Sequence, residues 1–137
     1  EALEIKRTRK IGIVSQSTQM IENVQEIINV LMTRIVDIRF INTICYPTKR
    51  NHAQIKEMSV ENDLMIIIGS FTSANSNRLT EIAKERNSNT FQVTCADDLE
   101  PSWFNNISSV GVSAGASTPD YLIEDVTNKI KDIAKRD

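Results

Sequence analysis

The sequence predicts an α/β fold in which a parallel sheet is flanked by helices. Two periodicities alternate along the 137 residues: short apolar runs of strand length, and segments in which apolar residues recur every three or four positions. Short polar loops join them, and strand–helix alternation of this kind is typical of a parallel sheet. In such sheets ligands bind at the carboxyl ends of the strands, so the loops that follow the strands are where a site is expected.

The expected strands differ in how they are covered. Residues 64–68 are apolar throughout, as in a central parallel strand that is covered on both faces. Residues 35–41 alternate, with Val36, Ile38 and Phe40 apolar, which indicates a half-buried strand. The full set of expected strands is 11–14, 35–41, 64–68, 91–95 and 110–112.

The expected helices carry apolar faces of unequal strength. Residues 20–31 show a clear face, whereas a polar helix over 49–58 has a thin one. Thr118 is expected to cap the last helix, with Pro119 at its first position. We expect residues 1–42 to end one α/β lobe as strand–helix–strand, and residues 43–137 to form a C-terminal α/β lobe. The inner faces of the last two helices are expected to be Leu79, Ile82 and Ala83, and Leu122, Val126, Ile130 and Ile133.

Composition excludes several classes of protein. Apolar residues make up 40% and charged residues 25%, with a net charge of −2, so no nucleic-acid partner is indicated, and the basic run at residues 6–10 is expected to be solvated. No apolar stretch approaches the roughly 20 residues that cross a bilayer. Two cysteines do not make a disulfide-dense secreted scaffold. We therefore expect a reducing compartment, the cytoplasm or, in a eukaryote, a plastid-type organelle.

Three of the expected strand-to-helix junctions are unusually rich in serine, threonine, asparagine and glycine. If the strands are parallel, all three lie at one edge of the sheet, where the first-turn N–H groups and the dipoles of the helices favour negative charge. No Gly-Lys-Ser/Thr phosphate loop is present, so we expect neutral donors to hold a phosphate or diphosphate. The three junctions are residues 15–18, 69–78 and 113–118.

Cys45 follows one expected strand and precedes a helix, so it too belongs to the carboxyl edge. A helix N-terminus favours the thiolate, and two interpretations stay open: a metal-binding or reactive thiolate, or a small buried hydrophobic residue. Cys95 ends an alternating strand and is expected to pack in the core. His52 falls on the polar helix and is expected to be solvated, which leaves a Cys45–His52 nucleophile with little support.

Four stretches of the sequence resemble the LytB-type reductases, and the resemblance runs from about residue 11 to residue 133. The last two stretches are the most specific, because their order, spacing and strand–loop–helix context all agree. The four stretches are residues 16–18, 44–48, 73–79 and 110–120.

The resemblance implies an activity and a cofactor. Enzymes of this family hold a 4Fe-4S cluster through three cysteines. Electrons from ferredoxin or flavodoxin remove the hydroxyl of 4-hydroxy-3-methylbut-2-enyl diphosphate as water, which yields isopentenyl and dimethylallyl diphosphate for isoprenoid synthesis by the non-mevalonate pathway. The chain would then be the C-terminal half of a multi-lobe α/β reductase.

The resemblance also implies roles for individual residues. Carried over by position, Cys45 resembles the third cluster ligand. Ser17 and Thr18 match a threonine pair near the substrate hydroxyl, and Thr18 is the single candidate for a catalytic role in this half. The residues that resemble diphosphate ligands are Ser73, Asn75 and Ser117.

The sequence also departs from the family pattern. Ala74 stands where the family usually has a second serine, and Asn51-His52 stands where it has Arg-Gln. The family's other two cluster cysteines, its histidines and its proton-donating glutamate belong to an N-terminal half that this chain lacks, so we expect the chain alone to be inactive. Two alternatives stay open: a non-catalytic phosphate- or diphosphate-binding module that has lost the redox half, and a small hydrolase with Cys45 as nucleophile.

Overall fold

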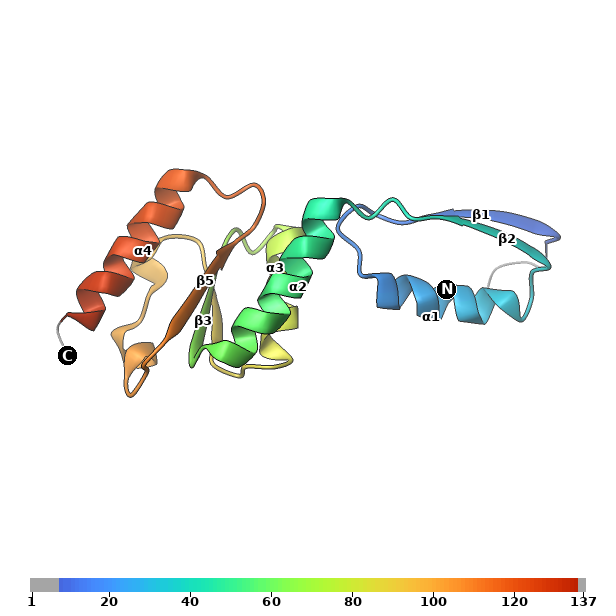
Figure 1. The fold of residues 1–137 in the computed structure, drawn as a ribbon. Helices are drawn as coiled ribbons and strands as arrows, with labels where there is room; N and C mark the ends of the chain where they lie inside the picture. Colours follow the sequence, from blue (N-terminus) through green and yellow to red (C-terminus); the bar gives the residue numbers. More distant parts are fainter. Residues whose placement is uncertain (1–7, 136–137) are drawn as a thin grey trace. The chain divides into compact units, whose positions relative to one another are not determined.

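A computed structural model of the chain describes residues 8–135 as alternating strands and helices (Figure 1). By internal contacts the chain divides into two compact units, Glu1–Arg50 and Asn51–Asp137, with the boundary inside helix α2. The lobe boundary expected at residues 42 and 43 stays a prediction. The elements in chain order are β1 (Lys10–Val14), α1 (Ile21–Met32), β2 (Asp37–Ile41), α2 (Tyr46–Glu61), β3 (Leu64–Ile68), α3 (Ala74–Lys84), β4 (Thr90–Val93), the 3-10 helices η2 (Ala96–Asp98) and η3 (Pro101–Phe104), β5 (Val110–Ala114) and α4 (Asp120–Ala134).

The first unit is a strand–helix–strand motif. β1 and β2 pair in parallel, with Ile11 beside Ile38 and Ile13 beside Phe40. These side chains are half-buried and alternate with exposed ones along both strands, as expected of a sheet covered on one face. Helix α1 joins the strands and buries two apolar residues two turns apart. The buried residues of α1 are Val24 and Leu31.

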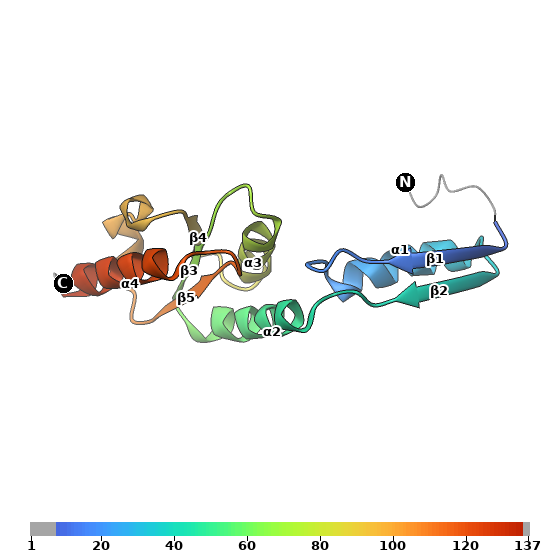
Figure 2. The same cartoon turned by 90° about the horizontal axis from the view of Figure 1, so that it is seen from above.

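The second unit contains three parallel strands in the order β4-β3-β5 (Figure 2). Every residue of the central strand β3 is buried, which confirms the prediction from its continuous apolar run. Ile68 pairs with Val93 on one side and with Ala114 on the other, so the three strands end together at the carboxyl edge of the sheet. The parallel α/β class is confirmed, although the strands form two sheets rather than one.

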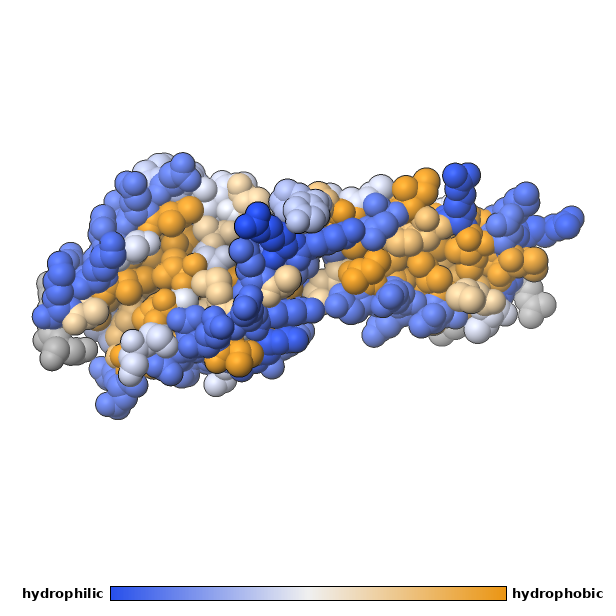
Figure 3. Space-filling model, in the orientation of Figure 1, coloured by the Kyte–Doolittle hydropathy of each residue, from blue (hydrophilic) through white to orange (hydrophobic). Residues whose placement is uncertain are grey.

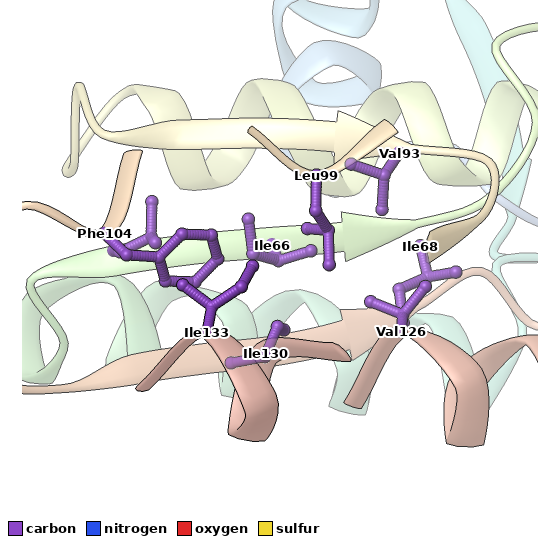
Figure 4. Close-up of a cluster of buried hydrophobic side chains, with 9 residues drawn as sticks. Ile66, Ile68, Val93, Leu99, Phe104, Val126, Ile130 and Ile133 are labelled. Atoms are coloured by element: carbon purple, nitrogen blue, oxygen red, sulfur yellow. The ribbon is translucent and has the colours of Figure 1, made fainter. Parts of the chain in front are cut away.

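Helices cover both faces of the three-stranded sheet, with α4 on one side and α3 on the other (Figure 1). On the α4 side, alternate residues of β3 enter a core with the two 3-10 helices (Figure 4). On the other side, Leu79, Ile82 and Ala83 of α3 are fully buried, as the helical spacing predicts. The core on the α4 side consists of Leu64, Ile66, Ile68, Val93, Leu99, Phe104, Val126, Ile130 and Ile133.

Helix α2 differs from its prediction. It begins at Tyr46, three residues earlier than expected, because Pro47 is tolerated in a first helical turn. His52 was expected to be solvated, and this is wrong: only 7% of it is exposed. The buried stripe of α2 is largely polar, so hydrophobic periodicity could not reveal it. The buried residues of the helix are Thr48, His52, Ile55 and Ser59.

Three further expectations need correction. Helix α4 begins at Asp120 with Pro119 as its N-cap, so Thr118 is not the cap and its hydroxyl bonds to β3 instead. Cys95 lies beyond the end of β4, where it precedes η2 and is half-buried rather than part of the core. Val36 lies outside β2, which begins at Asp37, and is 92% exposed.

Two sequence expectations concern membrane spans and the basic run near the N-terminus. Within residues 8–135, no helix is long and apolar enough to cross a bilayer. The basic run expected to be solvated begins at Lys6, and its first two residues lie outside the described range.

Candidate anion-binding site

At the carboxyl edge of the three-stranded sheet, two of the three expected loops lie side by side. Gly69 follows β3 and Gly115 follows β5. The Gly115 N–H donates to the Ile68 carbonyl at 2.9 Å, and the Thr118 hydroxyl donates to the same carbonyl at 3.0 Å. The loops that lead into α3 and α4 are therefore joined through the last residue of the central strand.

The loop before α3 is organised to present the first turn of that helix. Ser73 is the N-cap: its backbone is extended and its Oγ accepts a hydrogen bond from the Ser76 N–H at 3.3 Å. Because the oxygen accepts in this bond, the bond leaves the hydroxyl hydrogen of Ser73 unused. Asn77 Nδ2 donates to the Phe71 carbonyl at 2.8 Å and closes the loop from the helix side.

In the first turn of α3, two polar side-chain atoms are buried without a hydrogen-bond partner. They are the Asn75 amide, through Nδ2, and the Ser76 hydroxyl, through Oγ. A buried polar group without a partner costs roughly 1–3 kcal/mol, so such groups are uncommon in folded proteins. The Asn75 donor lies in the turn whose N–H groups and dipole favour an anion.

The residues predicted to bind diphosphate in this unit lie on these two loops. Ser73 and Asn75 lie at the start of α3, and Ser117 is exposed in the loop between β5 and α4. The third expected loop, residues 15–18, follows β1 and belongs to the other sheet. The expectation that all three loops share one sheet edge is therefore wrong: two of them do, and residues 15–18 follow a strand of the other sheet.

In the first unit, the segments that follow β1 and β2 lie together. The Ser15 N–H donates to Thr43 Oγ1 at 2.9 Å, and the Thr43 hydroxyl donates back to the Ser15 carbonyl. The Cys45 N–H donates to the Ser17 carbonyl at 3.1 Å. The backbone thus holds Ser17 and Thr18 next to Cys45, as expected for neighbouring parallel strands.

Cys45 lies immediately before α2 and is exposed. Its Sγ lies 2.7 Å from the Thr48 hydroxyl, in hydrogen-bond contact. This hydroxyl, followed by the Thr48 backbone N–H, lowers the pKa of the Cys45 thiol below its usual value, with a smaller contribution from the charge of Lys49. The arrangement favours a thiolate that is accessible from solvent.

Comparison with known proteins gives the family of the chain. The family model described as LytB protein matches residues 1–131. The chain belongs to the LytB family. The match includes both units, and therefore both the Cys45 segment and the two loops of the three-stranded sheet.

Two similar proteins carry the same name. A protein of Aquifex aeolicus named 4-hydroxy-3-methylbut-2-enyl diphosphate reductase is 40% identical over 132 residues, which is 96% of this chain and 46% of that protein. A protein of Campylobacter lari with the same name is 40% identical over 98% of this chain and 49% of that protein. The chain spans about half the length of the curated relatives it matches.

Two solved structures share the fold. One is a structure of (E)-4-hydroxy-3-methyl-but-2-enyl diphosphate reductase, the terminal enzyme of the non-mevalonate pathway. Its TM-score is 0.66 at 41% identity, over 91% of this chain and 44% of that one. The other, E-1-hydroxy-2-methyl-but-2-enyl-4-diphosphate reductase from Plasmodium falciparum, has a TM-score of 0.79 at 23% identity over 91% of this chain and 40% of that one, and it supports the fold alone.

The cluster that the LytB resemblance implies can be tested against the residues present. Cys45 fits one ligand position, because it is an exposed thiol with a lowered pKa and thiolates are the ligands of iron–sulfur clusters. Within the described part of the chain, no group of three or more histidine, cysteine, aspartate or glutamate side chains could hold a metal ion. Among the described residues, Cys45 therefore fits a single ligand position, and no complete metal site is present.

Sequence reasoning missed a residue that braces the loop before α3. Gln92 Nε2 on β4 lies within hydrogen-bond distance of the Gly69 carbonyl (3.2 Å), the Ser70 carbonyl (3.1 Å) and Asn77 Oδ1 (3.1 Å). Its Oε1 accepts from the Thr80 hydroxyl at 2.9 Å. A polar residue between two apolar neighbours of a strand was the available signal, but it does not tell what the side chain contacts.

Proposed function

We propose that this chain is the C-terminal portion of an iron–sulfur reductase that converts 4-hydroxy-3-methylbut-2-enyl diphosphate to isopentenyl and dimethylallyl diphosphate. The observation that carries the proposal is the buried Asn75 Nδ2, which has no partner and lies at the start of α3 beside the loop from β5. The LytB family match and the name of the relatives give the substrate class. Oxidoreductase activity in isoprenoid synthesis is the function of the parent protein.

The second unit is proposed to bind the diphosphate. Ser73 and Ser117 offer hydroxyl hydrogens from two adjoining loops, and Asn75 offers an amide donor. The N–H groups at the start of α3 add donors that the helix itself leaves unused. Neutral donors of this kind hold an anion without an opposing lysine or arginine, so the site needs no Walker-type lysine.

The first unit is proposed to serve the hydroxyl end of the substrate and the metal. Thr18, with Ser17, would contact the substrate hydroxyl, and Cys45 would supply one thiolate to the 4Fe-4S cluster. When bound, the cluster would deliver electrons from ferredoxin or flavodoxin to the substrate. The Cys45–Thr48 contact supports the thiolate, because the hydroxyl stabilises negative charge on sulfur.

The first unit also leaves apolar surface exposed, which supports a missing partner segment. Figure 3 shows apolar residues gathered over β1, β2 and α1. An apolar hollow of ≈ 340 Å³ lies on this unit, and Val36 and Met32 in its wall are 92% and 65% exposed. Because the chain spans about half of its relatives, we propose that the N-terminal half of the parent protein covers this surface. The wall residues are Ile28, Met32, Ile35, Val36, Ile38 and Phe40.

The remaining assignments follow from the same proposal. Residues 1–42 would end one lobe of the parent and 43–137 would form its C-terminal lobe. The chain alone would be inactive, because it carries one of three cluster cysteines. Two cysteines and no disulfide scaffold favour a reducing compartment, the cytoplasm or a plastid-type organelle.

A second candidate is a non-catalytic diphosphate-binding module that has lost the redox half. Ala74 favours it, because the family usually has a hydroxyl there that could contact the anion. The two candidates share the diphosphate site and differ in whether Cys45 joins a cluster in the presence of an N-terminal half.

Calorimetric titration with inorganic pyrophosphate tests the shared site. Hydrogen bonds to a charged group contribute roughly 1.5–3 kcal/mol, so Asn75→Ala should weaken binding about 10- to 150-fold. Its thermal melting should change little, because Ser73 and not Asn75 caps the helix. Asn128→Ala, an exposed change on α4, is the matched control and should leave affinity unchanged. Wild-type protein that does not bind pyrophosphate, or an Asn75→Ala variant that binds equally well, would contradict the proposal.

A further inference from the structure

Ser76 occupies an unusual position in the first turn of α3. Only 1% of the residue is exposed, and its Oγ has no hydrogen-bond partner. A buried hydroxyl without a partner costs free energy, so alanine would serve a merely apolar contact better. We therefore expect the role of the Ser76 side chain to lie in the space that it fills between its neighbours.

That space lies against two glycines at the ends of neighbouring strands. A methyl group at Gly69 would lie 2.2 Å from Ser76 Oγ and 2.8 Å from Ser76 Cβ. A methyl group at Gly115 would lie 2.3 Å from Oγ but 3.5 Å from Cβ, which is an ordinary contact distance. Ser76 thus fills the volume that a side chain at either glycine would need.

The backbone conformation at Gly69 and Gly115 does not itself require glycine. Among the described residues no glycine has a positive φ, so an alanine backbone could adopt the conformation at either position. Because neither glycine has a side chain, the first turn of α3 can lie closer to the ends of β3 and β5 than it could beside any other pair of residues. The turn that carries Asn75 is thereby seated between the loop after β3 and the loop after β5.

We propose that Ser76 is a positioning residue that, through its contact with Gly69 and Gly115, sets the first turn of α3 at the distance from which Asn75 and Ser117 reach one diphosphate. The inference rests on the proposed function, since it assumes that these loops bind the anion. It assigns Ser76 no contact with the ligand. The hydroxyl oxygen keeps the two strand ends and the helix in fixed register, and a larger group at either glycine displaces the turn.

Three single variants and two double variants test the inference through pyrophosphate affinity, measured by calorimetry on the 137-residue chain. Gly115→Ala should weaken binding by at least about 10-fold, the loss of one hydrogen bond to a charged group. Ser76→Ala alone should weaken it less, and Gly115→Ala in the Ser76→Ala background should have no further effect, because the remaining Cβ lies 3.5 Å away. Gly69→Ala should not be rescued by Ser76→Ala, because its 2.8 Å overlap with Cβ persists.

Controls separate positioning from folding. Gly12→Ala is the matched control, since a methyl group there meets nothing within 4 Å, and it should leave affinity unchanged. Ser76→Ala should not lower the melting temperature, because it removes a buried hydroxyl without a partner. Two results would overturn the inference. One is a Gly115→Ala variant with a lower melting temperature but normal pyrophosphate affinity. The other is a Gly115→Ala variant whose affinity is not restored by adding Ser76→Ala. Wild-type protein that does not bind pyrophosphate would remove the diphosphate proposal and this inference together.

Discussion

Cys45 shows how a single neighbour can favour the thiolate form of a cysteine. The sequence predicts that a helix N-terminus favours the thiolate. In the structure the largest cause is more local, because the Thr48 hydroxyl lies 2.7 Å from Sγ and stabilises the charged sulfur. Thr48 is buried on the inner stripe of α2, so its side chain is held where it can make this contact.

Thr48→Val should raise the pKa of the Cys45 thiol, since valine keeps the shape and removes the hydroxyl. Less thiolate at neutral pH means slower alkylation, and the midpoint of the rate against pH should move upward. Iodoacetamide alkylation followed by mass spectrometry measures this, with Cys95 in the same chain as internal reference. Thr127→Val on α4 is the matched control. An unchanged midpoint at Cys45 would mean that Thr48 does not activate the thiol.

Asp98 is a second residue with a defined electrostatic role, in the turn that follows β4. Its Oδ2 accepts from the Thr94 hydroxyl at 2.6 Å, the Thr94 N–H at 2.7 Å and the Cys95 N–H at 3.2 Å. These bonds, with the Thr94 hydroxyl contributing most, lower the pKa of the Asp98 carboxyl. The stabilisation is present above the unfolded-state pKa of about 4 and is lost as pH falls through the lower, folded-state pKa.

Asp98→Asn should therefore destabilise the protein most near neutral pH. As the pH falls through the folded-state pKa, the wild-type carboxylate is protonated and the difference between the two proteins should shrink. Urea melts at pH 7 and at several values below pH 4 measure the difference. Asp97→Asn changes the net charge equally but leaves the three hydrogen bonds to Asp98 in place, so it is the matched control. A difference that stays constant over the pH range would exclude the proposed role of the Asp98 carboxylate.

At the scale of elements, strands were easier to predict than the helices that accompany them. The apolar run of β3 predicted a central buried strand, and it is one. The buried stripe of α2 is largely polar, so periodicity underestimated the helix and assigned His52 to solvent. Thr118 has the chemistry of a cap, but its hydroxyl donates to the Ile68 carbonyl and the N-cap of α4 is Pro119. In both α2 and the start of α4, tertiary contacts and not local sequence preferences determine the structure.

Gln92 on β4 connects the loop before α3 to the sheet through its side-chain amide. Gln92→Leu introduces an apolar, branched side chain that is one atom shorter, and it leaves the Gly69 and Ser70 carbonyls without the amide donor. We expect a loss of roughly 1–3 kcal/mol in the free energy of unfolding, which urea melts measure. We also expect faster amide exchange in residues 70–73. Gln54→Leu on the exposed side of α2 is the control, and equal melts for both variants would refute the bracing role.

At the scale of the whole molecule, the family resemblance identified more than the pattern of residues could. Composition and periodicity predicted a parallel α/β protein with an anion site, and the LytB resemblance implied the substrate and the cluster that we propose for the parent protein. Neither could identify Ser76 or Gln92, because their importance lies in contacts with residues 7 to 39 positions away. The loops could be singled out from the sequence because short polar donors at helix starts form a local sequence pattern.

The number of cysteines leads to a prediction about the isolated chain. With two cysteines, of which Cys45 alone fits a ligand position, the 137-residue chain should not hold a stoichiometric 4Fe-4S cluster. Anaerobic reconstitution followed by iron and sulfide analysis is the measurement. Cys45→Ser should leave the small amount of bound iron unchanged in the isolated chain. Near-stoichiometric cluster on a monomer would contradict the prediction that the remaining ligands come from the other half of the parent.

The central claim is that the two loops of the second unit bind one diphosphate. Amide proton–nitrogen spectra recorded during titration with inorganic pyrophosphate test it most directly. The claim predicts that amides at the start of α3, at Asn75 and Ser76, and amides of the β5–α4 loop, at Ser117 and Thr118, shift together with a single Kd. Shifts confined to one loop, different Kd values for the two loops, or no shift at either would contradict it.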